Sequence, residues 1–349
     1  MCVNMRVIHM NRKDERGLVS FMITIVMMVV ISLIVVGFTQ VANRNRRQAL
    51  DRQLSTQAFY AAESGVNDAV SAISALAPGS PIPKQTSCLG ADYPATTINS
   101  APLVRYTCVL VSPTVPDIIV PPTTQSSSVV PINPQDSTGA PIPATELTFS
   151  WMFAEGQSGN PGSCSQPGVF RTTALETCGY ALLRVDLLRK SGQTSATALA
   201  ASTATFYMQP VRSGAADYTF SDFSSPKAHI VAAACSSVTG RCTARLLLSG
   251  TASYTSYVAR IVGLYREPRG LIVDGKSGAT NSWFGDAQAI IDVTGKAQDV
   301  LRRVKVRVPL HDMGGENVPL GGIYSSSTVC KRFTASPTMY QPEDPVACP

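Results

Sequence analysis

The stretch LVSFMITIVMMVVISLIVVGF at residues 18–38 decides the fold of this chain, because it places 21 uncharged residues in a row. At about 1.5 Å per residue, a helix of this length spans about 31 Å, close to the hydrocarbon thickness of a bilayer. A cleaved secretory signal would be shorter and would end in small residues of the A-x-A type, whereas Val36-Gly37-Phe38-Thr39-Gln40 stands here. The stretch therefore predicts a membrane-spanning helix.

The same helix is predicted to continue beyond the membrane to Leu76, before Ala77-Pro78-Gly79 ends it. Apolar residues recur along it at intervals of three or four: Leu50, Leu54, Ala58, Ala61, Gly65, Ala69, Ile73 and Leu76. Most of these are small, so another backbone can approach closely. That backbone belongs either to the head of the same chain or to a neighbouring subunit.

Composition excludes some classes of function. Charged residues make up only 15% of the chain, and the net charge of +6 includes +2 from the basic leader before Leu18. This is not the excess expected of a nucleic-acid-binding protein. Abundant Ser, Thr, Pro and Gly instead favour a β-rich head outside the cytoplasm.

Eight cysteines follow the apolar stretch, and an even set in such a head is typical of disulfides. Pairing of sequence neighbours would give Cys88–Cys108, Cys164–Cys178, Cys235–Cys242 and Cys330–Cys348, although eight cysteines allow 105 pairings and unpaired buried thiols are the alternative. A zinc or redox site is not supported, since no CxxC pair occurs and only His229 and His311 lie beyond the leader. Basic residues flank the helix equally, so the cysteines decide the orientation: amino end inside, carboxyl end outside.

The remainder is predicted to form two regions. Residues 77–145 hold 13 prolines and predict irregular chain with one strand near Val104–Val111. From residue 146 to 349 a period of two predicts an antiparallel, disulfide-bearing head of one or two domains, which makes the whole an α+β fold. Thr294-Gly295-Lys296 is typical of a hairpin turn between its last two strands. The expected strands are Leu147–Met152, Ala181–Leu188, Ala204–Met208, His229–Ala233, Arg245–Leu248, Tyr257–Tyr265, Ala287–Val293 and Val300–Val308.

Motifs that would carry catalysis fail on their context. Residues 270–277 fit the phosphate-loop pattern G-x-x-x-x-G-K-[ST], but their inner Leu-Ile-Val is typical of a strand and no helix start follows. His229 begins a strand and His311 ends one, so neither is favoured as a base. The carboxylates are scattered, without EF-hand spacing. We therefore expect no catalytic residues, no metal site, no cofactor and no enzyme activity.

A basic stripe of Arg303, Lys305 and Arg307 occupies one face of the last expected strand. Such a face suits DNA, lipid headgroups or an acidic neighbour. A solvated strand face explains it more simply, since no aromatic residues are interleaved with the charges. No specific nucleic-acid partner is predicted.

Taken together, residues 12–76 resemble the amino-terminal region of PilX-type minor pilins. The leader ends in Arg16-Gly17, as prepilin leaders end in a basic residue and glycine, and Gln57–Val66 is similar to the family pattern A-x-x-A-A-E-A-G. The resemblance implies cleavage by prepilin peptidase between Gly17 and Leu18. It also implies helix packing through Leu54, Ala58, Ala61, Glu63 and Gly65. The terminal Cys330–Cys348 loop resembles the disulfide-bounded region of many pilins.

One departure refines that expectation. Major pilins carry glutamate at the fifth mature position, where this chain has Met22. A subunit with Met22 lacks the carboxylate that would pair with a neighbouring subunit's amino terminus in an apolar filament core. The resemblance therefore implies a minor pilin at or near the filament tip, anchored in the inner membrane and assembled with other pilins. A type II secretion pseudopilin and a signal-anchored extracytoplasmic binding module or enzyme are the alternatives.

Overall fold

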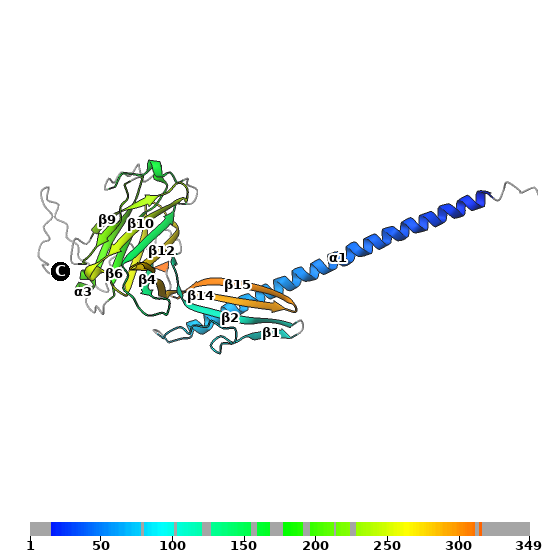
Figure 1. The fold of residues 1–349 in the computed structure, drawn as a ribbon, viewed down its shortest axis with the longest axis horizontal. Coiled ribbons are helices and arrows are strands. Elements are labelled where there is room, and N and C mark those ends of the chain that lie inside the picture. The colour runs from blue at the N-terminus through cyan, green and yellow to red at the C-terminus, as the bar shows by residue number, and fades with distance from the viewer. Residues whose placement is uncertain are drawn as a thin grey trace, which may run out of the picture. The chain divides into compact units, whose positions relative to one another are not determined.

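The computed structural model combines one long helix, a β-rich head and three disulfides (Figure 1), which confirms the predicted α+β class. It describes residues 15–77, 80–100, 103–120, 127–154, 159–167, 177–190, 196–212, 214–223, 228–310 and 314–315. The chain divides into two compact units. The first comprises Met1–Ser112 and Ile290–Arg307, and the second comprises Pro113–Ala289 and Val308–Pro349.

In the first unit, the long helix packs on a small sheet. Helix α1 runs from Glu15 to Ser74, close to the predicted range. The strands follow the order β1-β2-β14-β15. Their full bounds, parts of which belong to the second unit, are β1 Thr96–Ser100, β2 Leu103–Val115, β14 Trp283–Ala297 and β15 Val300–Pro309.

The second unit is almost entirely β structure. Its strands follow the order β14-β4-β11-β6-β7-β9-β10-β5-β12-β13, and the described neighbours are antiparallel except for the parallel pairs β7–β9 and β8–β10. The strands not yet given are β3 Ile118–Val120, β4 Ser127–Gln135, β5 Glu146–Met152, β6 Leu182–Arg189, β7 Thr203–Val211, β8 Tyr218–Phe220, β9 Ala228–Cys235, β10 Arg241–Leu248, β11 Tyr257–Leu264, β12 Arg269–Ser277, β13 Thr280–Asn281 and β16 Gly314–Gly315. Short helical segments are η1 Pro161–Ser163, α3 Ala196–Ala201 and η2 Gly250–Ala252.

Alternation of buried and exposed residues gives the second unit its core. Trp151, Phe149, Phe206 and Tyr257 are fully buried. The polar groups of two of them are satisfied internally, as buried donors require. Trp151 Nε1 donates to the Ala181 carbonyl at 3.0 Å, and the Tyr257 hydroxyl donates to the carbonyl of Ala252 at 2.6 Å. All eight strands expected from the period of two are present, as β5, β6, β7, β9, β10, β11, β14 and β15.

The expectation for residues 77–145 was wrong in part, because this region contains β1 to β4 rather than one strand. Proline lacks a donor but keeps its carbonyl, so it is tolerated where only the acceptor is needed. Pro134 lies within β4 and its carbonyl accepts a hydrogen bond from the Ile142 amide at 3.0 Å. The sequence left open whether the head forms one domain or two; in the structure, residues 290–307 group with the helix in the first unit.

The predicted hairpin turn was misplaced by a few residues. β14 continues through Thr294-Gly295-Lys296 to Ala297, and the chain reverses at Gln298-Asp299, where Gln298 has a φ of 54°. Gly295 is needed inside the strand for a different reason, which is its contact with α1.

Three of the sequence-neighbour cysteine pairs are bonded: Cys88–Cys108 in the first unit, and Cys164–Cys178 and Cys235–Cys242 in the second. The last of these joins directly opposed residues of β9 and β10. Cys330 and Cys348 lie outside the described residues.

Candidate functional site

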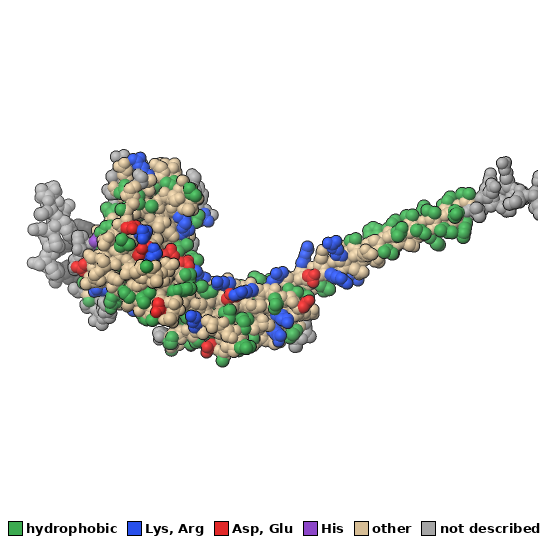
Figure 2. All heavy atoms as spheres, viewed as in Figure 1, with side chains coloured by type: hydrophobic (Ala, Val, Ile, Leu, Met, Phe, Trp, Pro, Cys, Tyr) green, Lys and Arg blue, Asp and Glu red, His purple; other side chains and the backbone are tan. Residues whose placement is uncertain are grey.

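The leading half of α1 is apolar on every side. Its large hydrophobic residues from Val19 to Phe38 are 42–72% exposed. The most apolar window has a mean hydropathy of 3.0 and is unburied, so by length and composition this helix can cross a membrane. Figure 2 shows this apolar surface along the outer part of the helix. Met22 is 61% exposed within it.

Hydroxyl groups in this half do not create a polar side. Thr24 donates to the Phe21 carbonyl at 2.7 Å, and Ser32 donates to the carbonyl of Met28 at the same distance. Their hydrogen-bonding capacity is met by the helix itself, as an apolar environment requires. The leading half is therefore suited to lipid or to other apolar helices.

The following half of α1 has two different sides, and one of them is packed on the first unit's own sheet. Ala58, Ala61, Ala62 and Ala69 are at most 2% exposed. Leu54, which is partly buried, packs against a cluster that consists of Ala58, Ala61, Val104 and Ala297. The predicted close approach therefore exists, but its partner is the chain's own β14 and β2. Of the two alternatives left open by the sequence, the structure shows that Ala58 and Ala61 pack on the same chain.

Two glycines make this approach possible. A Cβ atom on Gly295 would lie 2.0 Å from the Ala58 carbonyl oxygen and 2.5 Å from the Ala62 amide nitrogen. A Cβ atom on Gly65 would lie 2.8 Å from both Tyr106 Cγ and Val293 Cγ1. Helix and strand backbones are thus in near contact, which only glycine allows. Gly65 was recognised from the sequence, whereas Gly295 was taken for a turn residue.

Polar contacts fix the helix on the sheet at two further points. The Tyr106 hydroxyl donates to Asp68 Oδ2 at 2.8 Å, and Arg302 Nε donates to Ser55 Oγ at 2.7 Å. Burial raises the pKa of Tyr106 above its ordinary value, and the neighbouring Asp68 carboxylate raises it further. The phenol therefore remains a donor at neutral pH.

The opposite side of this half is exposed. Phe59 and Tyr60 are 46% and 60% exposed, and their rings meet edge to face with centroids 5.9 Å apart. Glu63 is also exposed on this side. Exposed aromatic residues next to apolar ones are typical of contact surfaces. We call Phe59, Tyr60 and Glu63 the outer helix face. In the sequence, the signal for it was the position of Phe59 and Tyr60 between members of the small-residue stripe.

The predicted processing residues Gly17 and Leu18 lie in the first turns of α1. Residues 1–14, which include most of the leader, lie outside the described part of the chain, as does His311.

The remaining sequence candidates are placed in the β structure of the second unit. The phosphate-loop-like stretch is strand β12, so its amides are not arranged around an anion. His229 is buried in β9, where its ring stacks on Phe206 and its Nδ1 lies 2.9 Å from the Tyr218 hydroxyl. Burial lowers the pKa of His229. Neither element has the geometry of a catalytic centre.

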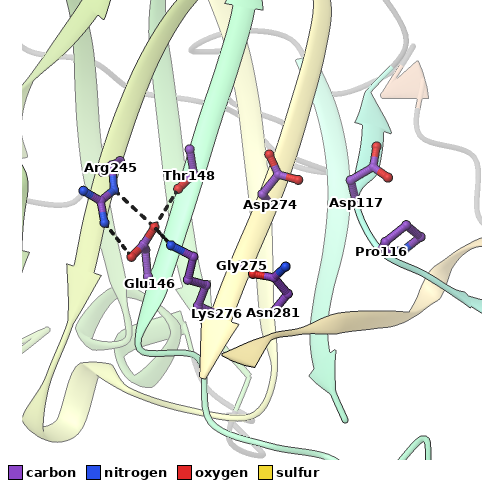
Figure 3. A pocket seen from close by; sticks show the side chains of 9 residues that line it. All are labelled: Pro116, Asp117, Glu146, Thr148, Arg245, Asp274, Gly275, Lys276 and Asn281. Carbon is purple, nitrogen blue, oxygen red and sulfur yellow. Dashed lines mark hydrogen bonds and ion pairs between the residues drawn. The ribbon is translucent and has the colours of Figure 1, made fainter. Parts of the chain in front are cut away.

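A polar pocket of about 500 Å³ in the second unit was not predicted from the sequence (Figure 3). Glu146 on β5 lines it and is 8% exposed. Arg245 Nη2 lies 2.8 Å from Glu146 Oε2, and Lys276 Nζ lies 3.3 Å from Oε1. The lining residues are Pro116, Asp117, Glu146, Thr148, Arg245, Asp274, Gly275, Lys276 and Asn281.

Electrostatics indicate that this cluster is structural. Hydrogen bonds from Arg245 hold the pKa of Glu146 below its ordinary value, with a further contribution from Lys276. A carboxylate with a lowered pKa is a weak base. Burial, followed by repulsion from Asp117, raises the pKa of Asp274 across the pocket. Among the described residues no group of three metal-ligating side chains occurs. Glu146 on β5 therefore links this strand to β10 and β12 through its ion pairs with Arg245 and Lys276.

A comparison with protein families gives a match that lies within α1. The family model described as PilX N-terminal matches residues 16–67, which include the apolar half of α1 and much of its packed half. Neither the search of curated proteins nor the search of solved structures gave a match. The resemblance found in the sequence is thus confirmed for residues 16–67, which match the amino-terminal segment of PilX-type minor pilins.

Proposed function

We propose that this chain is a minor pilin-like structural subunit of a type IV pilus, located at or near the filament tip, where it takes part in pilus assembly and in adhesion or DNA uptake. The observation that carries the proposal is the division of α1. Its leading half is apolar and unburied. In its following half the outer helix face is exposed, while the other side packs on the sheet of the first unit. A match to the PilX amino-terminal segment supports it.

The outer helix face gives the proposal a physical basis. A helix that only anchored a head would need no exposed aromatic residues beyond the membrane. Phe59 and Tyr60 offer apolar area with little loss of side-chain entropy on binding, as contact residues do. Neighbouring pilin subunits are the partners, and the apolar half packs with theirs in the filament. The role is structural, with no catalysis and no cofactor.

Met22 supports a minor role. An apolar side chain here cannot pair with the amino terminus of an adjacent subunit, so this chain lacks one interaction expected of a repeating subunit. A position at the tip requires that pairing least. The inner membrane holds the precursor, with its head outside the cytoplasm.

The first experiment tests processing. Co-expression with a prepilin peptidase should shorten the chain so that it begins at Leu18, and Gly17→Ala should abolish that mass shift. If the chain stays at full length in cells that process other prepilins, the pilin assignment is overturned and a signal-anchored binding module is favoured.

A second experiment tests the outer helix face. Phe59→Ser with Tyr60→Ser should leave the head folded but reduce the amount of the chain in sheared filaments about tenfold or more, because two apolar anchors are lost. Asn67→Ser, also exposed on this helix, is the matched control. Equal recovery of both variants would contradict assembly through this face. Recovery with secretion pseudopili rather than surface pili would identify a type II pseudopilin.

A further inference from the structure

The sheet of the first unit has two unlike faces. Helix α1 covers one face, which includes Tyr106 of β2 and Val293 of β14 at Gly65. Val300 of β15 packs toward the same helix. Because neighbouring strand residues point to opposite faces, residues 103, 105, 107, 292, 294, 296, 301, 303, 305 and 307 belong to the other face. We call this the outer sheet face.

The outer sheet face is strongly basic. It contains Arg105 from β2, Lys296 from β14, and Arg303, Lys305 and Arg307 from β15. Within these strand segments Asp292 is its acidic residue, and it pairs with Arg303 through contacts of 2.7 and 2.6 Å. Five cations against one carboxylate leave a net charge of +4.

Part of this charge is not neutralised inside the described chain. Arg105 Nε is buried and has no hydrogen-bond partner among the described residues. Lys305 is exposed and Lys296 is partly exposed. Arg307 makes further contacts of its own, yet without it four cations still face one carboxylate. The basic stripe of Arg303, Lys305 and Arg307, which the sequence suggested is a solvated strand face, is thus one edge of a basic patch across three strands.

We propose that the outer sheet face binds the phosphate backbone of duplex DNA without reading its sequence. Alternate residues of a strand are about 6.7 Å apart, so Arg303, Lys305 and Arg307 form a row about 13 Å long. A DNA duplex carries one negative charge per about 1.7 Å of its axis, which gives such a row several phosphates to contact. Charge complementarity supplies affinity and requires no base contacts.

The chemistry of the face favours duplex DNA over other anionic partners. Single strands are held by aromatic side chains, and the aromatic residue of these described strand segments, Tyr106, lies on the helix side. Binding at a lipid surface requires a row of apolar residues, whereas the exposed large apolar side chains of the described face are Leu103 on β2 and Leu301 on β15. A protein partner would need aromatic anchors at the centre of the interface, and the face has none among its described residues.

This inference deepens the DNA-uptake part of the proposed function, and it rests on that function for the location of the face outside the cell. The binding itself is a property of the first unit. Failure of peptidase cleavage would remove the pilin role and leave DNA binding intact, whereas failure of binding would leave the pilin role intact.

The test is fluorescence anisotropy of a labelled DNA duplex of mixed sequence with the full chain in neutral detergent micelles. With three phosphates neutralised, the slope of log affinity against log salt should be about −2.7, and affinity should fall about 40-fold from about 50 to about 200 mM salt. Lys305→Ala should reduce the slope by about 0.9 and Lys305→Arg should restore it. Lys84→Ala, which removes an exposed lysine of the same unit outside these strands, should leave the slope unchanged.

Several outcomes would overturn the proposal. These are absence of binding at low salt, equal slopes for Lys305→Ala and Lys84→Ala, tighter binding of a single strand than of the duplex, and preference for vesicles of anionic phospholipid over duplex DNA at equal phosphate. A second duplex of unrelated sequence should bind equally, and strong discrimination between the two would contradict backbone recognition.

Discussion

The two units of this chain are stabilised in opposite ways. In the first, a helix and a strand meet where side chains are missing, at Gly65 and Gly295, with alanines around them. In the second, strands pack through large buried side chains such as Trp151 and Phe206. The buried carboxylate of Glu146 also links three of these strands. The first arrangement leaves the far side of α1 accessible. We infer that close backbone packing serves the presentation of the helix, whereas the second unit follows the ordinary rules of a β core.

The largest expected effect comes from Gly295→Ala. The added methyl carbon would overlap the backbone of Ala58 and Ala62, and backbone atoms cannot rotate away as side chains do. We expect the first unit to lose more than about 3 kcal/mol of unfolding free energy, at the upper end of overpacking effects. Hydrogen–deuterium exchange should show lost protection in β2 and in α1 after Leu54. Protection in the second unit is the internal control, and unchanged protection of β2 would contradict the close approach.

A smaller effect is expected from a pair of glycines on the same helix. Gly65→Ala brings a methyl carbon 2.8 Å from Tyr106 and Val293 side-chain atoms, which have some freedom to move. We expect a loss of about 1–3 kcal/mol in the first unit. Gly37→Ala meets nothing within 4 Å, so the better helix propensity of alanine should leave stability unchanged or raised by up to about 1 kcal/mol.

Thermal unfolding of the two variants in the same detergent measures this difference. Equal melting temperatures would mean that the two halves of α1 are not distinguished by packing.

The contrast between the units also marks what the sequence revealed. The apolar run of residues 18–38 and the end of α1 were predicted, because length, hydropathy and helix-breaking residues are local properties. The eight strands of period two were predicted for the same reason. The partner of the Ala58 and Ala61 stripe was not, since a row of small residues accepts any backbone and does not specify which one arrives.

Features that depend on topology were missed. Glu146, Arg245 and Lys276 are far apart in the sequence and meet because β10 and β12 both pair with β5. The basic face of the first unit requires residues 290–307 to return to the helix, which no local pattern indicated. The prolines of residues 77–145 concealed β4 because a strand tolerates them wherever its amide donor is not needed.

The smallest of these effects distinguishes the units by pH. The folded-state pKa of Glu146 is below its ordinary value of 4.5, so its contribution to stability is complete above that value and is lost as pH falls through the folded-state pKa. Glu146→Gln should cost the second unit about 1–2 kcal/mol at pH 7, a partial loss because Arg245 and Lys276 are 40% and 41% exposed. As pH falls from 4.5 through the folded-state pKa, the difference in stability between the wild-type chain and the variant should disappear. Glu63→Gln, on the exposed side of α1, should cause no loss in either unit at any pH. Urea unfolding followed by exchange in β5 and β10 measures the difference, and a constant gap from pH 7 to acid would show that Glu146 stabilises the strands by shape rather than by charge.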